Sequence, residues 1–450
     1  MAKLYEMKQT GGRVMNLVGG FDIGNGYTKA AVLNMAGGGV TDVDMPSCAS
    51  VVPNPTNVKP EPSEVGKIVD SMYEHLDVQI GSHMVSEGRR LFIGNRAMTS
   101  GIQPFEFNVA SHLSKANDPL SVILLLSSIA GKAMKDLWAT DHKFTPDVTV
   151  LNVVAVLALP IREYVQHGKS YRANLMSRPH MITVHNFDVD VVFQINFVDV
   201  AVLPEGAAAQ FALNDRDEAF MNLLLSRAKD NMLQVYARKD GKEDAEAAAA
   251  CRKNILFDTT AKDIFAASNT IGVDIGEGTV NFPVYLNGEF NTDISSTLPI
   301  GYGSVLAGSL KDAQDQGFGF KTRKELSEYL KRKPTHLQAR RFMTVQNIVD
   351  NHVTSLVESI AVEFSSVMGQ AGSMVEVVYV YGGGATPIRE ELYRKLMDTM
   401  RVNQQEDVIL LYLDSSWSRE LNREGLLVAA NARAKAYWAR QQAAVAQAKE

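Results

Sequence analysis

Residues 14–29 read VMNLVGGFDIGNGYTK, and residues 270–285 read TIGVDIGEGTVNFPVY. Each stretch is a run of apolar and β-branched residues that reaches an aspartate, Asp22 or Asp274, just before a glycine-containing turn. Such a run predicts a β-strand, and the turn predicts that the chain folds back as a hairpin. The two hairpins are 252 positions apart. A repeated hairpin indicates two domains with related cores.

Helices and strands alternate outward from these hairpins, which predicts the α/β class with buried parallel strands. Further strands are predicted at residues 40–45, 148–159, 191–203, 375–381 and 407–413. Helices are predicted at residues 119–139, 161–175, 204–213, 304–313, 322–331, 339–368 and 387–400, and from residue 421 onward.

The 450 residues exceed the usual size of one domain, about 100–200 residues, so we expect at least two domains. Charged residues concentrate between the first domain and the second hairpin, which predicts an insertion of two polar helices joined by a charged turn. The expected division is a first domain at residues 14–213 with a small subdomain at about 47–108, the insertion at 214–270, a second domain at 271–414, and a C-terminal helix at 415–450 that returns to the first domain.

Composition excludes several classes of protein. The 45 basic and 51 acidic residues give a net charge of −6, a poor balance for gripping nucleic acid over a broad surface, so we expect no direct nucleic acid binding. Cys48 and Cys251 are the only cysteines, so neither a disulfide scaffold nor a zinc site is expected. No apolar run reaches the ~18 residues of a membrane span, and residues 1–14 lack the apolar core of a secretory signal. We therefore expect a cytoplasmic protein without membrane partners.

The first hairpin contains groups that suit a phosphate. Asp22 lies near the end of a strand, the turn follows, and a cation, Lys29, comes seven positions after the aspartate. Glycines let backbone N–H groups approach an anion closely. The phosphate-contacting stretch is Gly24, Asn25, Gly26, Tyr27, Thr28 and Lys29. An Asn-Gly turn is equally typical of a plain β-hairpin, and this alternative stays open for one hairpin alone.

The second hairpin repeats the acid, the turn glycines and the hydroxyl, in Asp274, Gly276, Glu277, Gly278 and Thr279. Because the pattern occurs twice, we expect two backbone loops and two carboxylates to converge on one Mg²⁺-phosphate group. The nine histidines are scattered and indicate no transition-metal site.

Two further motifs lie outside the hairpins. Gly382, Gly383, Gly384 and Ala385 follow an apolar strand and precede a helix, where glycine backbone can lie against a nucleoside. A plain strand-to-helix turn is the alternative. In the segment LPEGAAA, Glu205 precedes an alanine-rich helix and is placed to orient a water; the alternative is an acid in the first helical turn, stabilised by the helix dipole.

The order of DIGNGYTK, LPEGAAA, DIGEGT and GGGATP resembles the actin, Hsp70 and sugar-kinase ATPase superfamily, and within it the ParM-type actins that segregate bacterial plasmids. The resemblance implies the actin-like fold, in which two related α/β domains with ribonuclease H-like cores surround a nucleotide cleft. It also implies that Asp22 and Asp274 hold hydrated Mg²⁺, that the two hairpin turns bind the phosphates of ATP or GTP, and that Lys29 contacts the β- and γ-phosphates. Glu205 would position the hydrolytic water, the Gly382–Gly384 backbone would pack on the adenosine, and Asn281 would lie near the attacking water.

By resemblance, the expected function is a Mg²⁺-dependent ATPase that polymerises into filaments and segregates plasmid DNA through a DNA-binding adaptor protein. Two alternatives stay open: a membrane-associated actin of cell shape or cell division, and a small-molecule kinase of the same superfamily. A kinase would need a separate base for its acceptor, for which the sequence offers no candidate. A chaperone is disfavoured because the residues after the last strand are too few for a peptide-binding domain, which takes about 50–200 residues.

Overall fold

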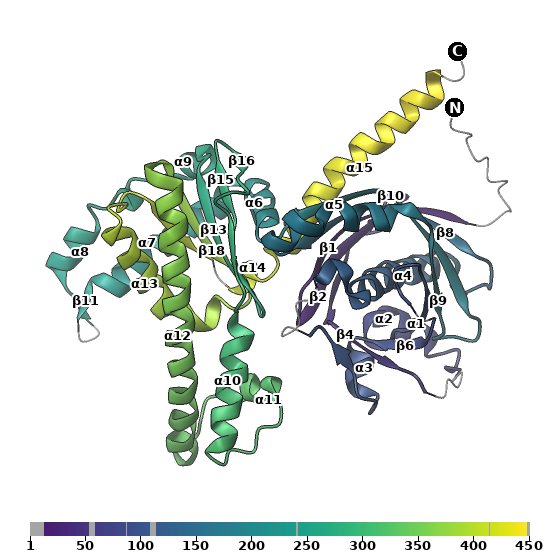
Figure 1. Ribbon diagram of the computed structural model, residues 1–450, viewed down its shortest axis with the longest axis horizontal. Coiled ribbons are helices and arrows are strands. Elements are labelled where there is room, and N and C mark those ends of the chain that lie inside the picture. The colour runs from purple at the N-terminus through teal and green to yellow at the C-terminus, as the bar shows by residue number, and fades with distance from the viewer. Residues whose placement is uncertain are drawn as a thin grey trace. The chain divides into compact units, whose positions relative to one another are not determined.

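The computed structural model describes residues 13–53, 59–86, 88–108, 114–239, 242–413 and 415–447 (Figure 1). The expected small subdomain, charged insertion and C-terminal helix each include a few residues outside these ranges. The chain forms two compact units. Unit 1 comprises Met1–Leu159, Gln166–Leu203 and Arg423–Glu450, and unit 2 comprises Pro160–Val165 and Pro204–Asn422.

Unit 1 is built on a ten-stranded sheet with the order β3-β2-β1-β8-β10-β9-β5-β6-β4-β7. Its strands are β1 (Val14–Ile23), β2 (Tyr27–Asn34), β3 (Thr41–Pro46), β4 (Cys48–Val51), β5 (Asp77–Gly81), β6 (Arg90–Ile93), β7 (Phe105–Glu106), β8 (Thr149–Leu159), β9 (His180–Val184) and β10 (Val191–Pro204). The predicted hairpin is present as β1 and β2, which pair antiparallel, while β1 and β8 pair parallel.

Helix α4 (Pro119–Asp141) is the main buried helix of unit 1. It begins where the Asp118 side chain accepts a hydrogen bond from the backbone N–H of Leu120 at 2.9 Å, with Pro119 in the first turn, and it ends at His142 in a left-handed conformation. The other helices of unit 1 are α1 (Val65–Asp70), α2 (Met72–His75), α3 (Asn95–Thr99) and most of α5 (Ile161–Ser177), with a 3₁₀ turn at Lys115–Asn117.

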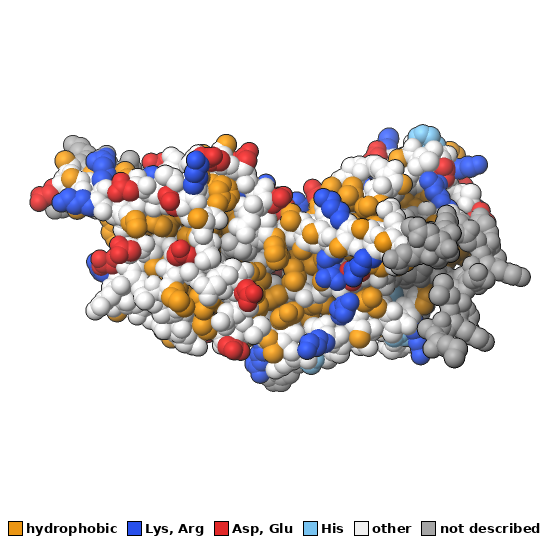
Figure 2. Space-filling view, turned by 90° about the horizontal axis from the view of Figure 1, so that it is seen from above, with side chains coloured by type: hydrophobic (Ala, Val, Ile, Leu, Met, Phe, Trp, Pro, Cys, Tyr) orange, Lys and Arg blue, Asp and Glu red, His pale blue; other side chains and the backbone are white. Residues whose placement is uncertain are grey.

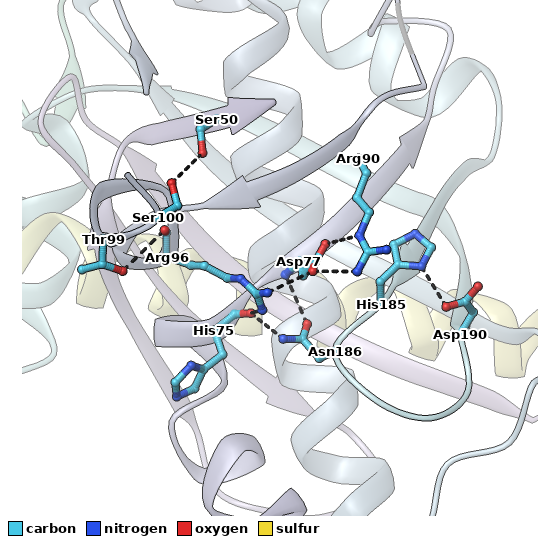
Figure 3. A network of polar contacts seen from close by, with 10 residues as sticks. All are labelled: Ser50, His75, Asp77, Arg90, Arg96, Thr99, Ser100, His185, Asn186 and Asp190. Atoms are coloured by element: carbon cyan, nitrogen blue, oxygen red, sulfur yellow. Dashed lines mark hydrogen bonds and ion pairs between the residues drawn. The ribbon is translucent and has the colours of Figure 1, made fainter. Parts of the chain in front are cut away.

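A buried carboxylate fixes the outer strands of unit 1 (Figure 3). Asp77 is 2% exposed and accepts two hydrogen bonds from Arg90, at 2.7 and 2.8 Å, and an ion pair from Arg96 at 3.2 Å. The backbone N–H of Asp77 donates to Asn186, whose side chain in turn donates to the carbonyl of His75. The Asp77 carboxylate thus joins β5 to β6 and α3, and its backbone N–H adds the segment after β9.

Unit 2 contains a seven-stranded sheet around β13 (Thr270–Ile275). The return arm of its hairpin is divided at Pro283 into β14 (Val280–Phe282) and β15 (Val284–Leu286), which pair with β13 in one continuous register. Proline lacks an N–H group, which explains why the predicted single strand is interrupted. The remaining strands are β16 (Glu289–Phe290), β17 (Ser296–Leu298), β18 (Val377–Tyr381) and β19 (Ile409–Tyr412), and a separate two-stranded hairpin joins β11 (Arg238–Lys239) to β12 (Lys242–Glu243).

The two sheets have related cores. In unit 1 the order β3-β2-β1-β8-β10 places the hairpin beside a parallel neighbour. In unit 2 the hairpin β13-β14 is flanked by β17 on one side, and β18 and then β19 run parallel to β13 on the other. The predicted repeat of the fold is therefore confirmed, and unit 1 extends it with five further strands.

Helices cover both faces of the sheet in unit 2. Val378 and Val380 of β18 pack with α12 (Ala339–Ala371) and α13 (Arg389–Val402), whereas the alternate residues Val377 and Tyr379 pack on the opposite side with α7 (Glu218–Tyr236). Alternation along a strand explains this division. The other helices are α6 (Ala207–Asn214), α8 (Ala245–Cys251), α9 (Ala261–Ala266), α10 (Tyr302–Asp315), α11 (Arg323–Leu330) and α14 (Ser415–Ser418), with 3₁₀ turns at Ile255–Phe257, His336–Gln338, Gly372–Met374 and Thr386–Ile388.

The charged segment 214–270 departs from the predicted pair of polar helices, because it contains α7, α8 and α9. Helix α7 is amphipathic, and its buried residues Leu224, Leu225 and Ala228 belong to the core that covers β18 and β19. The charges on its exposed face dominate the composition, so they conceal the apolar stripe that the core requires. We therefore describe α7 as a layer of unit 2.

Helix α15 (Leu421–Gln447) closes the chain, and from Arg423 it belongs to unit 1. Its backbone at Leu426 and Leu427 lies so close to Gly20 of β1 that a Cβ at position 20 would be 2.4 Å from the Leu427 nitrogen. Arg433 adds two hydrogen bonds to the Asp199 carboxylate, at 2.9 and 2.7 Å.

Charges of both signs are distributed over the surface shown in Figure 2, separated by hydrophobic and polar side chains. Within the described part of the chain, no helix combines the length and the apolar character that crossing a membrane requires.

Candidate functional site

The two hairpin turns have the same backbone geometry. Gly24 donates its N–H to the carbonyl of Tyr27 at 3.0 Å, and Gly276 donates to the carbonyl of Thr279 at 2.9 Å. Strand register then places Lys29 opposite Asp22 in unit 1 and Asn281 opposite Asp274 in unit 2. The two motifs are thus alike in structure, and Lys29 of the first occupies the position that Asn281 occupies in the second.

In unit 1, Ser47 stabilises the first hairpin turn with two hydrogen bonds to its carbonyls. Its hydroxyl donates to the carbonyl of Gly24 at 2.6 Å, and its N–H donates to the carbonyl of Gly26 at 3.0 Å. The buried Thr28 hydroxyl lies 3.0 Å from the same serine oxygen. The Thr28 side chain therefore acts inside unit 1, and any contact of this residue with a phosphate would come from its backbone.

In unit 2, the first residues of α10 stabilise the second hairpin turn in the way that Ser47 stabilises the first. Tyr302 and Gly303 donate their N–H groups to the carbonyls of Gly276 and Glu277, at 3.0 and 2.8 Å. The first N–H groups of a helix have no partner within it, so the turn satisfies them. A Cβ at Gly301 would be 2.6 Å from both carbonyl oxygens, which explains the glycine there.

The turn carbonyls of unit 2 are thus occupied, whereas its N–H groups are not. Among the described residues, no backbone carbonyl accepts a hydrogen bond from the N–H groups of Glu277, Gly278 or Thr279. These three residues are half-buried. Consecutive N–H groups with this accessibility form a nest that suits an anion.

Three motifs that are far apart in the sequence meet at Asp274, which is 5% exposed. Gly206 of the LPEG segment and Gly382 of the triple-glycine segment both have positive φ, +80° and +96°. A Cβ at position 206 would be 3.3 Å from one carboxylate oxygen of Asp274, and a Cβ at position 382 would be 2.5 Å from the other. The side chain of Asn422 completes the surroundings by donating to the carboxylate at 2.8 Å.

Tyr381 fixes the LPEG turn beside this carboxylate. Its hydroxyl donates to the carbonyl of Gly206 at 2.7 Å, and the absent side chain of Gly272 leaves room for the ring. Burial, and then the negative charge of Asp274, raise the pKa of Tyr381 well above its ordinary value. The hydroxyl therefore remains a donor.

Glu205 and Asn281 are both buried, and the Asn281 amide donates to the Glu205 carboxylate at 3.3 Å. The same amide lies 3.4 Å from the Thr279 hydroxyl, and its oxygen accepts from Thr297 at 2.8 Å. Glu205 precedes Gly206, the N-cap of α6, and no acid occupies the first turn of that helix. The alternative of a first-turn acid is therefore wrong.

The triple-glycine segment packs on the second hairpin. Gly384 donates its N–H to the carbonyl of Ile275 at 2.8 Å, and a Cβ at position 384 would be 2.7 Å from the Ile275 side chain. A Cβ at Gly383 would meet no atom within 4 Å. Gly382 and Gly384 are thus required by packing inside unit 2, and Gly383 is the exposed member of the segment.

In unit 1, Lys29 lies on one face of the sheet between two carboxylates, because its register partners are Asp22 on β1 and Asp44 on β3. Asp22 and Lys29 are half-buried. This arrangement can hold the lysine in an extended position and present its ammonium group to an anion.

Sequence reasoning did not identify three polar residues at these turns: Ser47, Asn422 and Arg323. Arg323 forms an ion pair with Glu277 at 3.2 Å, in which both side chains are more than a third exposed. All three lie far from the motifs in the sequence. Of the three, only Ser47 could have been suspected from the sequence, because it closely follows a predicted strand; in the structure that strand ends beside the first turn.

A hydrated divalent cation fits the groups around Asp274. Among the described residues, no cluster of three or more His, Cys, Asp or Glu side chains could enclose a metal ion. Mg²⁺ usually keeps several waters and needs one or two carboxylates from the protein. Asp274 provides such a carboxylate, and the buried amide oxygen of Asn422, which has no hydrogen-bond partner among the described residues, provides an acceptor beside it.

Two family models match the chain in tandem. The model for the N-terminal domain of actin-like proteins matches residues 20–207, and the model for the C-terminal domain of the archaeal MreB-like actin homologue matches residues 272–394. The chain belongs to the actin-like superfamily. The second match begins within β13, so each of the two hairpins lies at the start of one matched domain.

Solved structures of actin-like proteins have the same fold. The Bacillus thuringiensis ParM structure with ATP is 17% identical, with a TM-score of 0.52 and coverage of 93% of this chain and 98% of that one. A non-polymerisable quadruple mutant of the pCBH ParM is 15% identical, with a TM-score of 0.53 and coverage of 92% and 98%. An archaeal actin homologue is 14% identical, with a TM-score of 0.53 and coverage of 93% and 99%. No curated protein sequence matches this actin-like chain.

Proposed function

We propose that this protein is an actin-like ATPase that binds Mg²⁺-ATP through its two hairpins, hydrolyses it, and polymerises in a nucleotide-dependent way. The observation that carries the proposal is the meeting of the LPEG, DIGEGT and GGG segments at Asp274 of unit 2. The two positive-φ glycines bring the backbones of the LPEG and triple-glycine segments against this carboxylate, so three segments that are far apart in the sequence surround one acid.

The phosphates are the part of the nucleotide that the turns suit. The N–H groups of residues 277–279 provide neutral donors, and Lys29 provides a positive charge in unit 1. Gly24, Asn25, Gly26, Tyr27 and Thr28 form a turn of the same geometry as Gly276, Glu277, Gly278 and Thr279, so we assign both turns to the same phosphate chain. Such donors can neutralise negative charge without any covalent chemistry.

Asp22 and Asp274 are the carboxylates we assign to hydrated Mg²⁺. The cation, when bound, supplies charge neutralisation for the phosphates. Asp274 accepts a hydrogen bond from Asn422, which orients the carboxylate. We assign the adenosine to the exposed backbone at Gly383, between Gly382 and Gly384, with Ala385 buried behind it.

Glu205 is the residue we assign to the attacking water. Glu205 is 7% exposed, and its carboxylate accepts a hydrogen bond from Asn281, which orients it as a candidate acceptor for a water. Asn281 is fixed in turn by Thr297, so the glutamate has a rigid support.

Polymerisation is supported by membership of the actin-like superfamily and by the likeness to ParM structures, one of which is a mutant described as non-polymerisable. In this proposal the protein binds further copies of itself, and a DNA-binding adaptor protein links the filament to plasmid DNA. Sedimentation and electron microscopy with Mg²⁺-ATP, Mg²⁺-GTP, Mg²⁺-ADP or no nucleotide test the nucleotide-dependent polymerisation directly.

The test of the enzyme is release of inorganic phosphate from ATP or GTP with no added acceptor. We expect release with Mg²⁺, loss of release in EDTA, and filaments only with triphosphate. Phosphate release that appears only when a small hydroxyl acceptor is present would favour a kinase. Absence of both nucleotide binding and sedimentation would overturn the proposal.

A further inference from the structure

Asn422 stands beside the proposed metal site although none of the recognisable motifs contains it. It is the second residue of α15, and its neighbour Leu421 is fully buried in the core of unit 2. The helix therefore sets the position of the Asn422 side chain. The Asn422 Nδ2 to Asp274 Oδ2 distance is 2.8 Å.

The two amide atoms of Asn422 are in different situations. A carboxylate is only an acceptor, so the amide nitrogen must face Asp274 and the orientation of the amide is determined. Its oxygen, Oδ1, is buried and accepts no hydrogen bond from any described residue. A buried unsatisfied acceptor is costly and calls for a missing donor.

We propose that Asn422 is a positioning residue for the metal site, which holds the Asp274 carboxylate through Nδ2 and accepts a hydrogen bond from a metal-bound water through Oδ1. This inference rests on the proposed binding of Mg²⁺-nucleotide. The required donor must be small and must lie next to a carboxylate, and a water on a hydrated Mg²⁺ meets both conditions. Groups that orient a metal ligand in this way typically change metal affinity by 10–100-fold when removed.

The arrangement of glycines around Asp274 supports the assignment. A Cβ at position 382 would clash with the carboxylate at 2.5 Å, a Cβ at position 206 would be tight at 3.3 Å, and the positive φ of both residues disfavours a side chain, so neither offers a side-chain donor. The Asn422 amide donates to Oδ2 of this carboxylate at 2.8 Å. Removal of this donor would take away one of the contacts that orient the carboxylate.

The experiment measures how strongly Mg²⁺ increases affinity for a non-hydrolysable ATP analogue. Isothermal titration is done in Mg²⁺ and in EDTA for the wild type, Asn422→Leu and Asn422→Ala. Leucine keeps the volume of asparagine without its donor or acceptor, and alanine removes the volume as well. We expect the ratio of the two affinities to fall about tenfold in both variants, while affinity in EDTA changes less than twofold.

Asn403→Leu is the matched control, because the half-buried Asn403 donates to Ser365 at 3.2 Å on α12 and touches none of the groups at Asp274. It should leave the ratio unchanged. Equal loss of affinity in Mg²⁺ and EDTA in the Asn422 variants would show a merely structural role, and an unchanged ratio would also overturn the inference. A wild type that binds the analogue no better with Mg²⁺ would instead overturn the proposed function. Melting curves without nucleotide identify any variant that fails to fold.

Discussion

Glu205 and Asn281 are 76 positions apart in the chain, yet the amide of one donates to the carboxylate of the other at 3.3 Å inside unit 2. Asn281 occupies the register position opposite Asp274 that Lys29 occupies opposite Asp22. The repeated hairpin has thus become specialised. In unit 1 the position carries a positive charge, and in unit 2 it carries a neutral amide that orients a glutamate.

Glu205→Gln should slow hydrolysis while leaving nucleotide binding nearly intact. Glutamine keeps the size of the side chain and removes the basic carboxylate, and a positioned general base typically contributes at least about 100-fold in rate. We expect phosphate release in single turnover to fall by that factor, and the affinity for a non-hydrolysable ATP analogue to stay within about twofold.

The matched control is Glu218→Gln, which changes an exposed acid in the first turn of α7 in the same unit. This variant should hydrolyse ATP at the wild-type rate. If Glu205→Gln also hydrolysed ATP normally, Glu205 would have no role at the water.

The variants Gly383→Ala and Gly384→Ala distinguish a glycine that contacts the nucleoside from a glycine that is required for packing inside unit 2. A Cβ at position 383 meets open space, so this variant should keep its stability within about 0.5 kcal/mol and yet lose at least about fivefold in ATP affinity if the adenosine lies on this backbone. A Cβ at position 384 would be 2.7 Å from the Ile275 side chain, so that variant should be destabilised by about 1–3 kcal/mol. Titration and urea unfolding measure the two quantities. A Gly383→Ala protein with normal ATP affinity would move the adenosine elsewhere.

The sequence predicted the hairpins, the long helix α12 and the order of the motifs because these features are local. Strand periodicity, turn glycines and helical spacing all act within a few residues. It did not predict β9, whose five residues alternate too briefly to stand out, or the apolar face of α7 beneath its charges. Ser47 and Asn422 could not be found either, because they act through tertiary contacts with Gly24 and Asp274 that no spacing in the chain records.

Lys29→Met should weaken binding of ATP more than binding of adenosine. The variant keeps an unbranched side chain at the register position between Asp22 and Asp44 and removes the positive charge. We expect ATP affinity to fall about tenfold or more, because a charge-assisted contact to phosphate is lost together with about 1.4 kcal/mol or more of binding energy. Adenosine affinity, measured by competition, should stay unchanged. Equal losses for both ligands would show that Lys29 supports the fold and does not contact a phosphate.

Asp77→Ala should destabilise unit 1 without touching the proposed site. Asp77 is 2% exposed and forms ion pairs with Arg90 and Arg96, so its removal breaks a largely buried charge network at a cost of about 3–5 kcal/mol. Asp398→Ala breaks an ion pair with Arg401 in which both side chains are more than half exposed, and it should cost less than about 1 kcal/mol. Urea unfolding followed by far-UV circular dichroism reports on both units, so the losses of Asp77→Ala in unit 1 and Asp398→Ala in unit 2 can be compared. A loss for Asp77→Ala no larger than that for Asp398→Ala would mean that water reaches the two arginines and that the outer strands are fixed by their apolar contacts alone.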